Sequence, residues 1–210
     1  MKRGFTIVEL VIVIVVVLLL ATIVTLGYRS AQDDSRDTAR RAAVQQIEQA
    51  VNALKLRTDS QIMVGSYRTT VLGLDSNGLC QYNSTTTYTS NTGSNWLYYK
   101  GAYPYFPCTL GQSLIANGLL SEDFFQKIPE RDDGYAKHSQ MEQSTSMVLY
   151  SCNTSPATSR KWILYYYLKS PTAEESASVD ALWNSCATTS PTLSALKTTL
   201  GMKAAVELNL

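Results

Sequence analysis

Residues that commonly carry chemistry are sparse in this chain of 210 residues. A single histidine, His138, excludes any site that needs two histidines. The sequence contains no Gly-x-Ser-x-Gly motif, no phosphate-binding loop and no His-Glu-x-x-His motif. We therefore expect that the protein is not an enzyme and holds no cofactor and no metal. The chemistry left to explain belongs to Glu9 and to four cysteines.

The cysteines all lie beyond the apolar amino-terminal stretch, at Cys80, Cys108, Cys152 and Cys186. An even number of cysteines in an exported domain is typical of disulfides. Of the three pairings, Cys80–Cys108 and Cys152–Cys186 are favoured, because each closes a local loop of about 30 residues, worth ~3–4 kcal/mol. A zinc site of four thiolates is the rival, although no closely spaced cysteine pair begins one.

Glu9 is the only charged residue in the stretch 5–26. A helix that rises about 1.5 Å per residue needs roughly 20 apolar residues to cross a bilayer, and this stretch is long enough. A carboxylate inside an apolar span is costly and is usually functional. Because the span contains no basic residue, the sequence predicts a partner from another molecule or from the chain's own amino terminus.

Lys2 and Arg3 precede the apolar stretch, which predicts an amino terminus in the cytoplasm and the remaining chain outside. Two simpler interpretations are a cleaved secretory signal peptide and a plain signal anchor. A secretory apolar region is shorter and ends in a small-residue cleavage site, for which Ala21-Thr22 is a poor match. Neither interpretation explains Glu9.

Residues 2–10, KRGFTIVEL, resemble the signature of type IV prepilins, in which a short basic leader ends in Gly before Phe-Thr-x-x-Glu-Leu. The resemblance implies that a membrane-embedded prepilin peptidase cleaves between Gly4 and Phe5, and that the new Phe5 amine is methylated. It also implies that the Glu9 carboxylate forms an ion pair with the amino-terminal ammonium of a neighbouring subunit in a filament. Such an ion pair at low dielectric is tolerable only when both charges are matched.

Residues 28–56 continue the helical pattern with no Pro or Gly. Apolar side chains recur at steps of three and four, which predicts one apolar helix face. Oppositely charged side chains also lie at helical spacing, and each pair is worth only a few tenths of a kcal/mol. These residues are Asp33, Arg36, Asp37, Arg40 and Arg41. We expect them to form a solvated charged face, with contacts between filament subunits as the alternative.

The head, residues 58–210, is rich in Ser, Thr and Tyr and has no internal repeat. Its best strand candidates are Ser146–Cys152 and Lys161–Lys169, which are rich in aromatic and aliphatic residues. One or two short helices are predicted over Ser113–Leu120 and Asp123–Gln126, and a turn is predicted at Asp75–Gly78.

The remaining parts of the head give weaker signals. Segments 62–72 and 79–110 read as loops with short strands or hairpins, and Asp180–Ala187 fits a short helix or a strand. In the tail 193–210, Leu193, Leu196 and Leu200 have helical spacing, and the sequence leaves the order of the tail open. Over residues 103–169 the head resembles pilins and pseudopilins in part, through a Tyr-Pro followed by a short helix and strands.

Two further groups in the head have side chains that can bind a ligand. Glu130, Asp132 and Asp133 offer carboxylates for Ca²⁺, but their spacing lacks a defined ligand loop, so a solvated turn is expected. The tyrosines at 98–99 and 165–167 offer a base-stacking surface, but packing of strand residues on the stem is preferred. The net charge of +1 leaves nucleic acid an unsupported partner.

Together these patterns predict an α+β fold in which a long amino-terminal helix packs on an antiparallel sheet. The segments are a leader (1–4), a transmembrane or filament-core helix (5–27), an amphipathic stem helix (28–57) and the extracytoplasmic head (58–210). The resemblance implies a filament subunit that polymerises with itself or other pilins. Its partners would be the prepilin peptidase, a membrane assembly platform and, before assembly, the lipid bilayer. The alternatives are a type II secretion pseudopilin and a monomeric membrane-anchored binding module.

Overall fold

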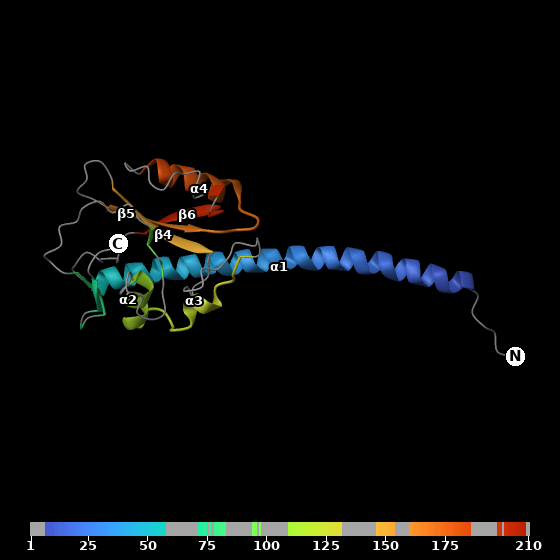
Figure 1. Cartoon of the computed structure of the whole chain (residues 1–210), viewed down its shortest axis with the longest axis horizontal. Coiled ribbons are helices and arrows are strands. Elements are labelled where there is room, and N and C mark those ends of the chain that lie inside the picture. The colour runs from blue at the N-terminus through green and yellow to red at the C-terminus, as the bar shows by residue number, and fades with distance from the viewer. Residues whose placement is uncertain are drawn as a thin grey trace.

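A computed structural model describes residues 7–57, 71–74, 76, 78–82, 94–95, 97, 109–131, 146–153, 160–185, 197–198 and 200–208. The dominant element is one helix, α1 (Ile7–Arg57), of 51 residues. At about 1.5 Å per residue its length is roughly 77 Å. Its first half projects away from the rest of the chain, and its second half runs through the head (Figure 1). The predicted continuous helix is confirmed.

The head is built on an antiparallel sheet in the order β3-β4-β5-β6. Its strands are β3 (Ser94–Asn95), β4 (Met147–Asn153), β5 (Arg160–Tyr166) and β6 (Ala204–Leu208). β4 and β5 pair over seven residues each, from Met147 opposite Tyr166 to Asn153 opposite Arg160. Both strands fall where the aromatic and aliphatic runs predicted them. The predicted α+β fold is therefore confirmed.

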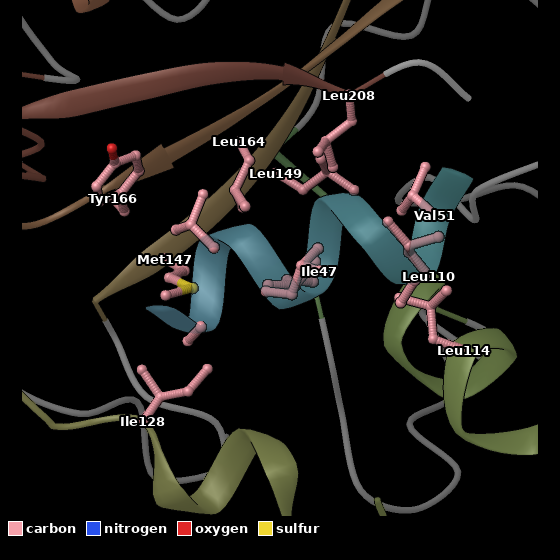
Figure 2. Packing of buried hydrophobic residues seen from close by; sticks show 14 of the residues in the cluster. Ile47, Val51, Leu110, Leu114, Ile128, Met147, Leu149, Leu164, Tyr166 and Leu208 are labelled. Carbon is pink, nitrogen blue, oxygen red and sulfur yellow. The ribbon is translucent and has the colours of Figure 1, made fainter. Parts of the chain in front are cut away.

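Both faces of the sheet are covered, which explains why Met147–Tyr150 of β4 and Trp162–Tyr166 of β5 are continuous apolar, buried runs. One face packs on α1, and α4 (Ala173–Asn184) covers the other (Figure 1). Leu149 and Leu164 point toward Ile47 of α1, and Leu110 and Leu114 approach α1 from the opposite side (Figure 2). The second half of α1 is thus the centre of the larger hydrophobic core.

Two short helices cover the side of α1 away from the sheet: α2 (Leu110–Ala116) and α3 (Phe124–Lys127) (Figure 1). α2 begins with a capping box. The Thr109 side chain accepts a hydrogen bond from the backbone amide of Gln112, and the Gln112 side chain accepts one from the backbone amide of Thr109. Both helices confirm the sequence prediction.

A two-stranded hairpin, β1 (Val71–Leu74) and β2 (Cys80–Tyr82), flanks the predicted turn. Gly78 in this turn has a φ of 71°, a left-handed conformation that glycine adopts without strain. Its carbonyl accepts a hydrogen bond from the Asn117 side-chain amide at 3.2 Å, which ties the hairpin to the end of α2.

The structure defines two parts of the carboxyl-terminal region that the sequence left open. α4 begins at Ala173, seven residues before the segment that fitted either a helix or a strand, because Thr172 and Glu175 form a capping box. The tail, whose order the sequence left open beyond the helical spacing of Leu193, Leu196 and Leu200, forms β6 along β5 at Ala204–Leu208. Its side chains alternate between the two cores, with Ala204 and Leu208 toward α1 and Ala205 toward α4.

Candidate functional site

The projecting half of α1, Ile7–Val24, carries a continuous apolar surface (Figure 1). All fifteen large hydrophobic side chains of this segment are exposed, and even the least exposed, Val16, is 48% accessible. Covering such a side chain contributes about 1.5–3 kcal/mol, so a cover over the whole surface is worth on the order of tens of kcal/mol. An exposed apolar surface of this extent marks an interaction or membrane site.

Among the described residues, α1 is the one helix long and apolar enough to cross a membrane or to act as a signal sequence. A bilayer needs roughly 20 apolar residues along a helix. The projecting half meets that length before the first charged residues of the stem begin at Arg29.

Glu9 lies in the first turn of α1, on this apolar half, and its side chain is exposed. The amide groups of a first helical turn carry a partial positive charge, which favours a carboxylate there. Gly4 and Phe5, which the sequence predicts to flank a cleavage site, lie outside the described residues. The processing prediction therefore stays a prediction.

A second group of polar residues surrounds α1 where it enters the head, and we call it the polar collar. Its members are Asp37, Arg40 and Arg41 of α1, Glu175 of α4, the Lys169–Ser170 amides and the Pro129 and Glu130 carbonyls. Asp37 and Arg40 form its centre, with Oδ1 and Nη1 2.8 Å apart and both side chains only 1% exposed.

Every oxygen of the Asp37 carboxylate is used. Oδ1 also accepts the backbone N–H of Lys169 at 3.0 Å, and Oδ2 accepts that of Ser170 at 2.8 Å. These two amides follow the end of β5, so the carboxylate fixes the sheet to the stem. A buried charge is tolerated only when it is paired and hydrogen-bonded in this way.

Arg40 binds the side of the head that lies across α1 from the sheet. Its Nε and Nη2 donate to the carbonyls of Pro129 and Glu130 at 3.3 and 2.5 Å. Its guanidinium also lies 5.1 Å from the centroid of the buried Tyr167 ring, a cation–π geometry. The pair Asp37–Arg40 therefore links the sheet and the α3 side of the head through one turn of α1.

Arg41 binds Glu175 in the first turn of α4. It donates from Nε and Nη2 to the two oxygens of Glu175 at 2.6 and 3.0 Å, and from Nη2 to the Ser170 carbonyl at 3.2 Å. The hydrogen bond with Arg41 lowers the pKa of Glu175, and the Thr172 amide contributes in the same direction. Glu175 thus caps α4 and binds the stem at once.

The polar collar corrects the interpretation of the stem charges. A solvated charged face was expected, and contacts between subunits were the alternative; neither describes Asp37, Arg40 or Arg41, which bind the head of the same chain. Helical spacing placed Asp37 near Arg40 correctly. It carried no information about Glu175, 134 positions away from Arg41.

The sequence does not connect three sets of collar members with the stem: Glu175, the Lys169–Ser170 amides, and the Pro129 and Glu130 carbonyls. Every residue except proline has a backbone amide, so the residue types at 169 and 170 do not indicate that their amides bind Asp37. The Thr172-x-x-Glu175 pattern was available, however, as the mark of a helix start with an acidic residue in its first turn.

The predicted cysteine pairs each have one member among the described residues. Cys80 begins β2, and Cys152 lies in β4 opposite Lys161 of β5. Cys108 and Cys186 lie outside the described residues. Both disulfides stay predictions.

The predicted carboxylate cluster is described only at Glu130, whose carbonyl belongs to the polar collar. Asp132 and Asp133 lie outside the described residues. Within the residues that are described, no group of three or more His, Cys, Asp or Glu side chains is placed to hold a metal ion.

The tyrosine run at 165–167 is buried, as the packing interpretation predicted. Tyr166 faces α1, whereas Tyr165 lies under α4 against Tyr150, with ring centroids 5.9 Å apart. Burial raises the pKa of the Tyr165 hydroxyl. These rings are therefore not a base-stacking surface, and Tyr98 and Tyr99 lie outside the described residues.

Comparisons of the chain with protein-family models, with curated proteins and with solved structures find no match. The features of this chain that bear on function are the exposed half of α1, the polar collar and the amino-terminal sequence.

Asp37→Asn should lower the free energy of unfolding of the head by about 3–5 kcal/mol, because Arg40 then stays buried without its counter-charge. Urea unfolding of the detergent-solubilised chain, followed by the fluorescence of Trp162 and Trp183, measures the change. Asp34→Asn is the matched control, since Asp34 is an exposed aspartate on the same helix. Equal loss of stability in both variants would contradict a special role for Asp37.

The lowered pKa of Glu175 predicts an acid-dependent loss of stability. Its contribution is complete above the ordinary glutamate pKa of about 4.3 and disappears as the pH falls through the lowered value. Glu175→Gln should cost on the order of 1 kcal/mol at pH 7, and its stability should converge with that of wild type in acid. Unfolding midpoints between pH 3 and 7 test this, with exposed Glu174→Gln as control. A constant gap across the range would show that the ion pair is not responsible.

Proposed function

We propose that this protein is a type IV pilin-like structural subunit that is processed at its amino terminus and polymerises through α1 into a surface filament. The observation that carries the proposal is the exposed apolar half of α1, which projects from a folded head. The amino-terminal sequence supports it, because residues 2–10 resemble a prepilin signature.

The proposed cycle follows from the two environments that can cover such a helix. Before assembly, the lipid bilayer covers Ile7–Val24, with the amino terminus in the cytoplasm and the head outside. In a filament, the same side chains pack against the helices of neighbouring subunits. The membrane assembly platform would move subunits from the first environment to the second.

Processing precedes assembly in this proposal. A prepilin peptidase would cut between Gly4 and Phe5 and leave the whole apolar helix on the mature chain, whereas a secretory signal peptidase removes the apolar segment. Cleavage also creates the ammonium group that the carboxylate of Glu9 would meet on a neighbouring subunit.

Gly4→Val should leave the leader attached, because glycine's missing side chain is what the peptidase cleft would accept at this position. Mass spectrometry of the membrane-extracted protein should find an amino-terminal, methylated Phe5 in wild type and an intact leader in the variant. Lys2→Arg, which keeps the leader's charge, should be processed normally. A wild-type chain that reaches the surface with residues 1–4 attached would contradict the family assignment.

Glu9 supplies the polymer-specific part of the proposal. A carboxylate in an apolar span costs on the order of 3 kcal/mol to insert by translocon scales. A plain membrane anchor gains nothing from that cost. In a filament core, an ammonium from the next subunit would compensate it, and the ion pair would set the axial position of each new subunit.

Glu9→Val and the near-isosteric Glu9→Gln should leave export, cleavage and head folding intact but reduce filament yield, because a neighbour's ammonium then lies unmatched in an apolar core. Shearing of cells and blotting of the extracellular fraction measure the yield. Thr22→Val is the matched control, since it removes a polar group from the same span without removing a charge. Equal yields from wild type and both Glu9 variants would favour the monomeric membrane-anchored module instead.

A further inference from the structure

β6 lies at one edge of the four-stranded sheet. Among the described residues it pairs with β5 on one side and with no strand on the other. An open edge strand presents backbone groups to which a strand of another molecule can add, and proteins usually cover or interrupt such an edge. The contacts along β6 therefore decide whether the head can associate by strand pairing.

The ladder of the sheet shows which amides of β6 face this edge. The Tyr167 N–H, directly after β5, donates to the Ser146 carbonyl, directly before β4, at 2.7 Å. Amides along a strand alternate between its two neighbours, so the even-numbered residues of β5 bond to β6. Tyr166 lies opposite Ala204. The even-numbered amides of β6 consequently face β5, and the odd-numbered amides, with that of Ala205 among them, face the free edge.

Ser178 of α4 binds this outward amide. Its Oγ accepts a hydrogen bond from the Ala205 N–H at 2.9 Å. The same hydroxyl donates its one hydrogen to the Glu175 carbonyl at 2.6 Å, which leaves its lone pairs for β6. A strand that added to this edge would have to displace Ser178 to reach the Ala205 amide.

Two contacts hold Ser178 at the edge. α4 packs against β6, and Val179 is buried with Ala205 in the smaller hydrophobic core (Figure 1). One turn earlier in α4, the Glu175 side chain forms its ion pair with Arg41 of the polar collar. The collar thus fixes the start of α4 to the stem, and with it the position of the serine that covers the edge amide.

Charged side chains flank the covered amide. Lys203 and Glu207 lie two positions to either side of Ala205, and both are exposed. Side chains alternate along a strand, so these two charges lie on the same face of the sheet as Ala205. Charged residues on an edge strand oppose its pairing with another strand, and β6 is only five residues long. The length, the charges and Ser178 all act against strand addition.

We propose that α4, through Ser178, closes the β6 edge of the sheet against strand addition and so prevents heads of neighbouring chains from associating edge to edge. The inference concerns the head, and it holds whether or not α1 polymerises. It matters most where chains are held side by side by a membrane or a filament, because tethering raises the local concentration of heads.

Hydrogen exchange of the detergent-solubilised full chain, resolved by residue, tests the contact. Ser178→Ala should make the Ala205 amide exchange several-fold faster and leave the Val206 amide slow, since Val206 bonds to β5. Ser178→Thr keeps the hydroxyl, and Ser176→Ala removes an exposed serine side chain from the same helix, so both should match wild type. An unchanged Ala205 amide in Ser178→Ala would overturn the inference. Equal acceleration at Val206 would overturn it too, because Ser178 would then support the whole sheet rather than its edge.

A strand probe tests the closure itself. A fluorescein-labelled peptide with the sequence of residues 202–208, MKAAVEL, can add to an open β6 edge in the way that a second copy of the strand would. Its fluorescence anisotropy should rise with Ser178→Ala but not with wild type or Ser176→Ala. Adding Glu207→Pro to Ser178→Ala should abolish the binding, because a proline removes an outward N–H and retains the bonds to β5. Equal anisotropy with Ser178→Ala and wild type, or binding that survives Glu207→Pro, would overturn the proposed closure.

Discussion

α1 must satisfy two environments along one unbroken helix, and the arrangement of the rest of the chain depends on that division. From Ile7 to Val24 its large apolar side chains are exposed, and from Asp37 onward one face forms the centre of the larger hydrophobic core. The polar collar lies at the beginning of this buried half. Its buried Asp37–Arg40 pair binds the sheet on one side and the Pro129–Glu130 carbonyls on the other, so the point at which α1 leaves the head is fixed by directional bonds.

Apolar packing alone would define this point less sharply. Ridges of Val, Leu and Ile accept small shifts along a helix, because the packing contacts are non-directional. The Asp37 carboxylate instead accepts hydrogen bonds from Arg40 and from two consecutive backbone amides, and a shift by one residue breaks all of them. The ion pair between Arg41 and Glu175 fixes α4 to α1 in the same way.

The sequence predicted the elements whose signals are local. The apolar run and the helical spacing after it gave the single helix, and the run around Trp162–Tyr167 gave β5. It did not predict β6, because the short segment Ala204–Leu208, with the sequence AAVEL, becomes a strand only by pairing with β5. The polar collar was missed for the same reason: its partners are backbone groups and a glutamate more than a hundred residues from the stem. Spacing along α1 shows which side chains share a face of the helix, but it does not show which residues of the head contact that face.

The central claim is that the apolar half of α1 stays on the mature chain and is covered both in the membrane and outside the cell. A membrane-impermeant maleimide tests this directly on Leu18→Cys, in the middle of that half, with exposed Ala177→Cys on α4 as the reporter for the head. In the sheared extracellular fraction, we predict that Ala177→Cys reacts at once and that Leu18→Cys is present but reacts only after detergent is added. Extracellular chains that lack residue 18, or whose Leu18→Cys reacts freely without detergent, would contradict the account.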